Sequence, residues 1–561
     1  MRRWLGDLSE RLAARVGALP ALKVIWGLVV LFSIWVVLDV LVFRITGGLA
    51  LSTYDAMVRA RVHAAAPDPR IVIVDIDEAS LARMGKEFGR WPWPRDTLAS
   101  VLGHIEAQAP LAIVWDVVFS EADRLSPGGD AAFDQAARRS RHSHFSVVRL
   151  PPANDAVSEI TRAALPGLWF ASAAVAPASS PPGVAASAPG LGQATVALIA
   201  PALPAVAAGP LGFNNGYVDS DGVLRRYRYA EPLADGGVLQ AIALSVLRSF
   251  DAPAATALAH RAVVAFASGG ELIAWREKPD VYPRVSIADV FAQADGGKPV
   301  VAVPSFAGKL VIIGSTAPSL HDVHPTPLSP MQAGVDSLAT VIDNAVNQRA
   351  MAELPRWLQA VIAVALIVGM ALWAQFKSVA SLSPALFALP AALMGINYLS
   401  LNGLPVFLDL HLAAALALLF VAVLRPWSSL RRAYWCSPPP PGPGPFAVWS
   451  LRRAGPWLDD ALDRLIDAVE KHAPECRIVV VDASVTWPTT LRWPELATGA
   501  AVVGPWAALQ AARPKLEPAL RRLARPSAEP LALGSHPDRE KLVATSLAAW
   551  STLGKADTTR H

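Results

Sequence analysis

The sequence predicts four transmembrane helices, a large extracytoplasmic α/β domain between the first and the second, and a small α/β cytoplasmic domain after the fourth. Of the 561 residues, 53% are hydrophobic and 17% are charged, against a typical charged share of about 25%, so part of the surface must face lipid. Four apolar runs approach the roughly 20 residues that an α-helix needs to cross a bilayer. Strand-like and helix-like segments alternate between the first two runs, which is typical of an α/β domain.

The charge balance and the cysteine count exclude other classes of protein. The 50 Lys and Arg residues nearly match the 46 Asp and Glu residues, so no strongly basic surface is available and nucleic acid is not an expected partner. The chain has two cysteines, Cys436 and Cys476, which excludes a disulfide framework.

The first apolar run stands alone near the N-terminus, whereas the other three lie close together in the sequence. The first, residues 21–43, is longer and bulkier than the apolar part of a cleaved signal peptide, and it does not end in small residues. We therefore predict a retained signal anchor. Three further runs, residues 357–376, 382–400 and 404–424, follow one another closely and predict a bundle with short connections.

The charges around these runs predict their orientation. Basic residues dominate around the start of the first run: Arg2, Arg3, Arg11, Arg15 and Lys23. The positive-inside rule then places residues 1–20 in the cytoplasm. By alternation, residues 44–355 lie outside, whereas a Pro-rich linker (residues 425–445) and a small domain (residues 446–561) lie inside. Both cysteines then lie in a reducing compartment, as expected for free thiols.

Short apolar segments in the outside domain predict a parallel sheet. Residues 70–77 and 111–116 are β-branched runs, and residues 98–108 between them have helical spacing. Such an order is the pattern of a βαβ unit. Residues 309–314 predict a third strand of the same kind.

Two other segments of this domain have a different character. Residues 217–231 predict a hairpin, because Asp219-Ser220-Asp221-Gly222 supplies turn residues. Residues 151–210 are dominated by Ala, Pro and Ser and predict a surface excursion or a flexible insertion.

Several motifs of the outside domain occur in an order that resembles the CHASE type 2 domain. These motifs are Gly89–Arg95 with Val114–Glu121, Gly212-Phe213-Asn214 with Asp219–Arg226, and Lys309–Ser315 with His321-Asp322, Thr326-Pro327 and Gly334-Val335. The family is an extracytoplasmic sensory module of bacterial receptors that is typically followed by three membrane helices. The resemblance covers residues 51–347 and implies a periplasmic sensor domain of an inner-membrane receptor, with an extracytoplasmic ligand that the sequence does not identify.

Four carboxylates are the first candidates for ligand binding. Asp75, Asp77 and Asp116 lie at the carboxyl ends of predicted parallel strands, and Glu121 comes shortly afterwards. Ligands of open α/β sheets bind outside the carboxyl ends of the strands, so a carboxylate cluster there could hold a cation or a cationic ligand. The competing interpretation, which we favour, is that these side chains cap helices and fix turns.

An aromatic and cationic loop supplies the other ligand-binding candidates, Arg90, Trp91, Trp93 and Arg95. The prolines of the loop stiffen it, and guanidinium groups beside aromatic rings suit an anionic or planar ligand. The competing and favoured interpretation is structural: the tryptophans cover the edge of the sheet, and Arg95 pairs with a neighbouring Asp.

Other polar residues predict neither a metal ion nor a cofactor. The segment His321-Asp322-x-His324 lacks the spacing of zinc motifs, and loop structure explains it better. Asp409 and His411 would lie in the first turns of the last span, close enough to the outer interface to reach it. Asn397 is more simply explained by a hydrogen bond between helices.

The tail predicts a small α/β module with no recognisable enzyme motif. The spacer at residues 437–445 is extended and Pro-rich. Residues 457–472 predict an amphipathic helix, residues 477–482 and 500–503 strands, and residues 507–523 another helix. Neither a phosphate-binding loop nor a kinase motif is present in this sequence. Asp482 at a strand end invites comparison with a phosphoacceptor, but a turn or cap is the simpler interpretation.

These observations predict a non-catalytic transmembrane receptor. The outside domain would recognise a ligand, the helices would relay the signal through the lipid bilayer, and the tail would bind a cytoplasmic signalling protein. A homodimer is compatible with this scheme. Two alternatives stay open: a divergent enzyme, with its site in the tail or among the outside carboxylates, and a structural component of an envelope assembly.

Overall fold

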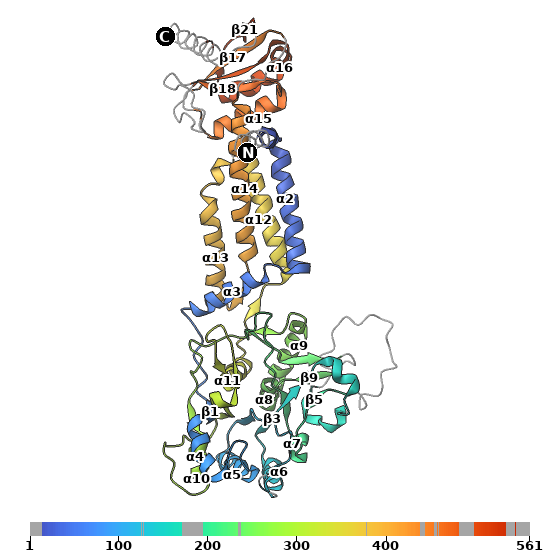
Figure 1. Ribbon diagram of the computed structural model, residues 1–561, viewed down its shortest axis with the longest axis vertical. Coiled ribbons are helices and arrows are strands. Elements are labelled where there is room, and N and C mark those ends of the chain that lie inside the picture. The colour runs from blue at the N-terminus through green and yellow to red at the C-terminus, as the bar shows by residue number, and fades with distance from the viewer. Residues whose placement is uncertain are drawn as a thin grey trace, which may run out of the picture. The chain divides into compact units, whose positions relative to one another are not determined.

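The computed structural model describes residues 14–124, 126, 128–170, 195–233, 237–376, 379–437, 444–453, 457, 459–481, 499–534 and 545. The chain forms two compact units (Figure 1). Unit 1 comprises Met1–Gly47, Pro355–Ile396 and Asp409–His561, and unit 2 comprises Gly48–Leu354 and Asn397–Leu408. The chain therefore passes between the two units four times.

Unit 2 is built on a parallel sheet, as the sequence predicts. Its parallel strands follow the order β11-β1-β12-β2-β3-β6. Their bounds are Arg284–Ser286, Ile71–Ile76, Leu310–Ser315, Ala112–Trp115, Ser143–Arg149 and Leu211–Phe213. Every residue of β1 and β2 is buried, which requires cover on both faces of the sheet. The structure inserts β12, the last of these strands in the sequence, between β1 and β2.

Two groups of helices provide this cover. In one group α4 (Glu78–Phe88), α5 (Arg95–Glu106) and α6 (Gly129–Arg139) pack together with α10 (Ile287–Ala294). In the other, α8 (Ile242–Phe250) packs against α9 (Ala252–Phe266) and α11 (Gly334–Val346). Because α11 also contacts β1 and β12, it covers the strand ends where the predicted carboxylates lie.

The predicted hairpin at residues 217–231 is wrong, although its turn is present. The Gly222 amide donates to the Asp219 carbonyl at 2.9 Å. The strands that follow pair elsewhere: β7 (Arg226–Tyr227) with β10 (Glu271–Leu272), and β8 (Ala230–Pro232) with β9 (Val238–Gln240). The buried Arg225 side chain forms ion pairs with Asp219 and Asp221 of the turn. The turn is therefore fixed by these ion pairs and not by a paired strand.

The predicted surface excursion at residues 151–210 is also wrong for the part that the structure describes. Leu168, Val196 and Val206 are fully buried, and β5 (Leu198–Ile199) pairs with β3. Residues 171–194 of this segment lie outside the described residues. Single turns of 3-10 helix and strands of two residues have no periodicity, so the sequence pattern could not reveal this packing.

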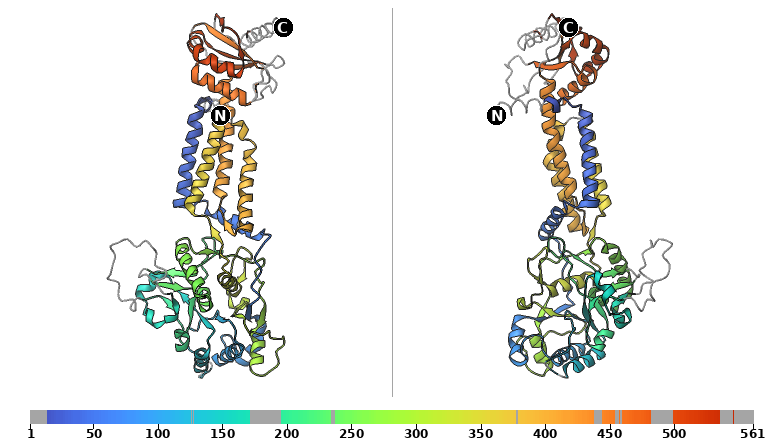
Figure 2. Two further views of the ribbon diagram at one scale, coloured as in Figure 1. Left: turned by 180° about the vertical axis from the view of Figure 1, so that it is seen from behind. Right: turned by 45° about the vertical axis from the view of Figure 1, so that its right-hand side comes forward.

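Four helices among the described residues are long and apolar enough to cross a membrane. They are α2 (Ala21–Leu38, continued by a π-helical turn to Phe43), α12 (Arg356–Phe376), α13 (Ala385–Gly403) and α14 (His411–Trp435). Within unit 1, α2, α12 and α14 pack side by side (Figure 2). The rings of Phe32 and Phe420 join α2 to α14 at 6.2 Å between centroids.

The last of these helices differs from its predicted bounds at both ends. It begins at His411 instead of Leu404, because α13 stops ahead of Pro405 and β16 (Val406–Phe407) pairs with β15 (Ala352–Glu353). Asp409 therefore precedes the helix, in a left-handed conformation with φ 54°. At its other end the helix continues to Trp435, so residues 425–435 are helical and not the start of a linker.

The small domain of unit 1 is an antiparallel sheet with two helices. Its strands are β17 (Phe446–Arg452), β18 (Arg477–Val481), β19 (Gly499–Pro505), β20 (Arg525–Pro526) and β21 (Leu531–Leu533), and its helices are α15 (Asp459–His472) and α16 (Trp506–Leu523). The order is β18-β19-β17-β20, with β21 also on β17. The sequence predicted both helices and the strands at β18 and β19, but missed β17 at the centre of the sheet. Asp482 lies outside the described residues.

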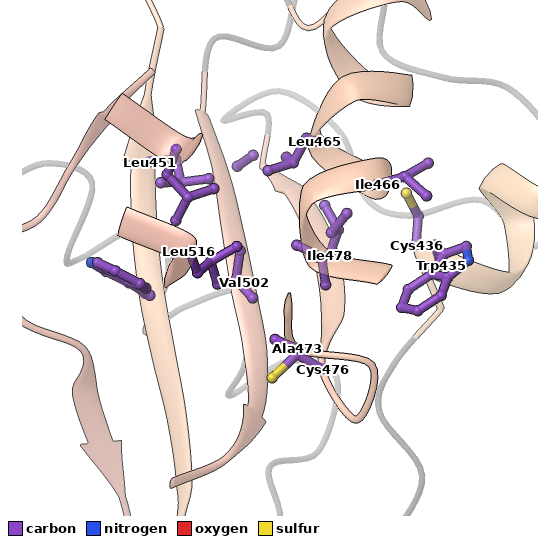
Figure 3. Close-up of a cluster of buried hydrophobic side chains, with 14 of the residues drawn as sticks. Trp435, Cys436, Leu451, Leu465, Ile466, Ala473, Cys476, Ile478, Val502 and Leu516 are labelled. Carbon is purple, nitrogen blue, oxygen red and sulfur yellow. The ribbon is translucent and has the colours of Figure 1, made fainter. Parts of the chain in front are cut away.

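The core of this domain includes the end of the last apolar helix. Trp435 and Cys436 pack with Leu465, Ile466 and Ile478 (Figure 3). Both cysteines are buried as free thiols. The small domain and α14 thus share one hydrophobic core, which fixes the orientation of the helix end within unit 1.

Candidate functional site

The structure separates the four predicted carboxylates. Asp75 is the next-to-last residue of β1 and accepts hydrogen bonds from the Thr316 backbone amide at 3.0 Å and the Thr316 hydroxyl at 2.7 Å. The Arg284 guanidinium lies 3.7 Å from it. Burial raises the pKa of Asp75, and the Thr316 hydrogen bonds oppose that rise. The Asp75 side chain is therefore occupied by protein partners.

Asp77 and Glu121 do not form a binding site with the other two predicted carboxylates. Asp77 caps α4 by accepting from the Ser80 amide at 2.7 Å, and it also accepts from the Ser286 hydroxyl at 2.9 Å. This is the helix-capping role that the competing interpretation predicted. The Glu121 side chain is 76% exposed. Asp77 lies close enough to Asp75 to raise its pKa, but its oxygens accept from protein groups, and Glu121 lies at the surface.

Asp116 lies on the other side of β12 from Asp75. Gly314 of β12 is paired with Asp75, and the Asp116 amide donates to the Ile313 carbonyl at 2.8 Å. Two strand spacings, about 10 Å, separate the backbones at these two positions. A Cβ atom at Gly314 would lie 2.7 Å from Val335 Cγ2 and 3.0 Å from Asp116 Cβ, so glycine is needed where α11 crosses this point.

A small cavity of about 70 Å³ opens beside Asp116. Its polar lining comes from separate segments of unit 2: Asp116 after β2, Asn214 after β6, Tyr227 in β7, Asp322 and His324 at β13 (Val323–His324), and Ser337 in α11. At this volume the cavity admits a few water-sized groups. It lies at the carboxyl ends of parallel strands, where α/β sheets bind ligands.

Two carboxylates face this cavity. Burial and, to a smaller extent, the neighbouring Asp322 raise the pKa of Asp116 to about 7, although the amide of Asn214, which donates to Asp116 Oδ1, opposes the rise. Burial also raises the pKa of Asp322, whereas His324, 3.6 Å away, lowers it. Asp322 lies at the rim, where its side chain is 43% exposed. The pair is thus a like-charged site that resists double ionisation when nothing else is bound.

Two buried hydroxyls on the cavity wall have no hydrogen-bond partner. Ser337 and Tyr227 are each 5% exposed, and neither the Ser337 Oγ nor the Tyr227 hydroxyl makes a hydrogen bond. The Ala243 amide at the start of α8 lies near the Tyr227 oxygen without bonding to it. Burial and the nearby Asp116 raise the Tyr227 pKa. Because buried polar groups are rarely left unpaired, a water or another small group in the cavity would pair with both hydroxyls.

The position of Asp322 is set by close backbone packing. The Gly334 amide donates to the Asp322 carbonyl at 2.9 Å. A Cβ atom at Gly334 would lie 2.3 Å from Asp322 Oδ2. The first residue of α11 must therefore be glycine for this carboxylate to occupy the rim.

The aromatic loop does not reach this cavity. Trp93 is 1% exposed and meets Trp91 edge-on, with 5.0 Å between ring centroids. Arg95 pairs with Asp130 at 3.3 Å and lies 4.9 Å from the Phe119 ring centroid. Arg90 is exposed. Arg95 is thus paired with an Asp, as the structural interpretation predicted, and Asp116 is the one predicted ligand residue that lines the cavity.

Sequence reasoning missed most of the cavity wall. Asn214 and Asp322 stand in the motifs that resemble the CHASE type 2 family, so motif order was the signal for them. Tyr227 and Ser337 carry no comparable signal. His321 is exposed and its ring nitrogen faces the Ser319 carbonyl at 3.1 Å. Among the described residues, no three His, Cys, Asp or Glu side chains gather as a group that could hold a metal ion.

One comparison with known proteins identifies the family of the chain. The family model of the CHASE2 domain matches residues 28–374, which is more than half of the chain. No curated protein and no solved structure matches the chain. CHASE2 is an extracellular sensory domain of signalling receptors, and the four apolar helices indicate a membrane protein. The chain therefore belongs to the CHASE2 domain family and has a sensory role.

Proposed function

We propose that the chain is an inner-membrane receptor that senses a periplasmic signal with unit 2 and passes it through the membrane helices to a non-catalytic small domain, which binds a cytoplasmic signalling protein. The observation that carries the proposal is continuity: α14 runs from the membrane span into the core of the small domain. The family match supports the sensory role. The basic residues around the first apolar run and at the end of α14 support the orientation.

Unit 2 firmly holds the segment that follows the first apolar helix. This segment is α3 (Gly47–Arg59). Its Asp55 carboxylate accepts from Arg225 Nε and Nη2, each at 2.7 Å. A bidentate pair of this kind fixes orientation as well as distance. A change in the fold around Arg225 would therefore move α3.

Unit 2 also contains the end of α13 and the two short strands that precede α12 and α14. The Tyr398 hydroxyl donates to the Ala60 carbonyl at 2.7 Å, and the Val62 amide donates to Asn402 Oδ1 at 3.1 Å. Strand β15 precedes α12, strand β16 precedes α14, and the two strands pair with each other. Unit 2 thus holds a segment next to each of the four apolar helices.

Ion pairs fix the small domain to α14 at the other end. Arg431 Nη2 lies 2.7 Å from Asp467 and also pairs with Glu470, and Arg432 Nε lies 2.7 Å from Asp463. These contacts join the last turns of α14 to α15. A shift or rotation of α14 would be transmitted to the small domain, which supports a relay role for this helix.

A comparison of two tagged chains tests this function. The full-length chain and a chain lacking residues 446–561 are purified from cells after chemical cross-linking. The proposal predicts a cytoplasmic signalling protein that co-purifies with the full-length chain and not with the shortened one. Recovery of the same periplasmic proteins with both chains, and of no cytoplasmic protein, would favour a component of an envelope assembly instead.

A further inference from the structure

We propose that the cavity beside Asp116 binds a hydrated divalent cation that prefers oxygen ligands, Mg²⁺ or Ca²⁺. The argument for ion binding uses residues of unit 2 alone. The further step, that this ion is the signal or a cofactor of its recognition, rests on the proposed receptor function.

The two carboxylates of the cavity have no Lys or Arg partner among the lining residues that the structure describes, unlike three other carboxylates of unit 2. Asp55, Glu231 and Asp343 each pair with a buried arginine at 2.7 to 2.9 Å, and these arginines are Arg225, Arg149 and Arg276. Among the described residues that line the cavity there is no Lys or Arg, and His324 is the one group that could become positive. A bound cation would supply the charge that arginine supplies elsewhere.

The chemistry of the lining favours a hard cation. Asp116 and Asp322 offer carboxylate oxygens, and Ser337 and Tyr227 offer buried hydroxyl oxygens that lack a partner. Oxygen ligands of this kind suit Mg²⁺ and Ca²⁺, whereas zinc sites are built mainly from Cys and His. An ion in the cavity would also satisfy the two hydroxyl groups, directly or through its water.

The size and the small number of strong ligands favour a partly hydrated ion. Two carboxylates line the cavity, and the described residues contain no group of three strong metal ligands. Mg²⁺ is typically held by one or two carboxylates and keeps several waters. A cavity of about 70 Å³ has room for an ion with a few waters and excludes a nucleotide or a peptide.

Binding would draw together segments that are distant in the sequence. The ligating groups come from the ends of β2 and β13 and from β7 and α11. The residues before β7 include Arg225, which holds α3 through Asp55. An ion that bridges these segments would stabilise one arrangement of unit 2 over another, which is the requirement for a ligand to shift a conformational equilibrium.

The test is metal binding by the purified full-length chain in detergent, after removal of bound metal with a chelator. Isothermal titration with MgCl₂ and with CaCl₂, at constant ionic strength, measures stoichiometry and affinity. The variants are Asp116→Asn and Asp322→Asn. The matched control is Glu121→Gln, which removes an exposed carboxylate that lies outside the cavity. Thermal unfolding of each chain without metal shows that it is folded.

We expect one Mg²⁺ or Ca²⁺ ion per wild-type chain, at least tenfold weaker binding in each Asp variant, and no change in Glu121→Gln. Equal binding by all four chains would overturn the proposal. So would a wild-type chain without saturable binding of either ion up to about 10 mM, which is well above the dissociation constants of weak extracellular calcium modules. If no ion binds, the receptor function still stands with another ligand. If the membrane topology is wrong, the ion site still stands but has no sensory role.

Discussion

The ion pairs of Arg225 allow the most quantitative prediction. The Arg225 side chain is 1% exposed. Its five N–H groups donate to three carboxylates, Asp55, Asp219 and Asp221, over distances of 2.7 to 3.1 Å. The change Arg225→Met removes all these bonds while keeping most of the buried volume. It leaves Asp55 and Asp221 without their guanidinium partner, whereas Asp219 keeps Arg226 at 3.9 Å.

The expected loss of stability follows from this geometry. Removing one partner of a buried ion pair typically costs about 3 to 5 kcal/mol. Because the Asp221 side chain is 42% exposed and can be rehydrated, we expect the lower end, about 3 kcal/mol. Removing one carboxylate of the cluster should partly offset the loss of its guanidinium partner. The change Asp55→Asn should therefore cost less stability in the Arg225→Met chain than in the wild-type chain.

Hydrogen–deuterium exchange of the full-length chain measures this effect in unit 2. The amides of the fully buried strand β1 exchange by opening of the sheet. A loss of about 3 kcal/mol corresponds to exchange faster by roughly 100-fold, at about 1.4 kcal/mol per factor of ten. The control Arg138→Met removes an exposed pair with Asp134, 70% exposed on its Arg side, and should change exchange by about twofold. If both variants accelerate exchange equally, the stabilising role assigned to Arg225 is refuted.

Three other predictions concern separate parts of the chain. Burial raises the pKa of Asp336 to about 6, above its usual 3.8. The contribution of Asp336 to stability is therefore complete below about pH 4 and is lost as the pH rises through 6. The difference in unfolding free energy between wild type and Asp336→Asn should change over this interval, and a constant difference would contradict this prediction. In the small domain, Leu465 is fully buried, and Leu465→Ala should lower the unfolding free energy by about 2 to 5 kcal/mol in denaturant titration, whereas a loss below about 1 kcal/mol would disprove its core position. Cys436 and Cys476 are buried and their pKa values are raised to about 12, so neither should react with a maleimide at pH 7 in the folded chain; rapid modification of either, measured by mass spectrometry, would show that the core is open.

The sequence allowed the elements of unit 2 to be predicted better than their arrangement. Strands β1, β2 and β12 are continuous apolar runs, and such runs are typical of a parallel sheet that is covered on both faces. Their order depends on contacts between residues more than two hundred positions apart, such as Asp75 with Gly314. A pattern within one window of sequence contains no information about such pairs.

The ends of elements were least predictable where tertiary contacts override local pattern. The run at residues 404–424 is apolar throughout, yet Val406 and Phe407 form a strand because they can pair with Ala352 and Glu353. The same limit applies to the cavity. Asp116 could be predicted from its place after a strand, whereas Tyr227 and Ser337 acquire their role by facing a cavity that exists in the folded chain alone.

The proposed receptor architecture requires unit 2 and the small domain to lie on opposite sides of one membrane. Because the native thiols are buried, reporter cysteines are placed at exposed positions instead, Ser220→Cys in unit 2 and Lys515→Cys in α16. Intact spheroplasts are treated with a membrane-impermeant maleimide, and the treatment is repeated after lysis. We expect that Ser220→Cys is labelled in intact cells and that Lys515→Cys is labelled after lysis alone. Labelling of Lys515→Cys in intact cells, or protection of Ser220→Cys until lysis, would contradict the receptor architecture.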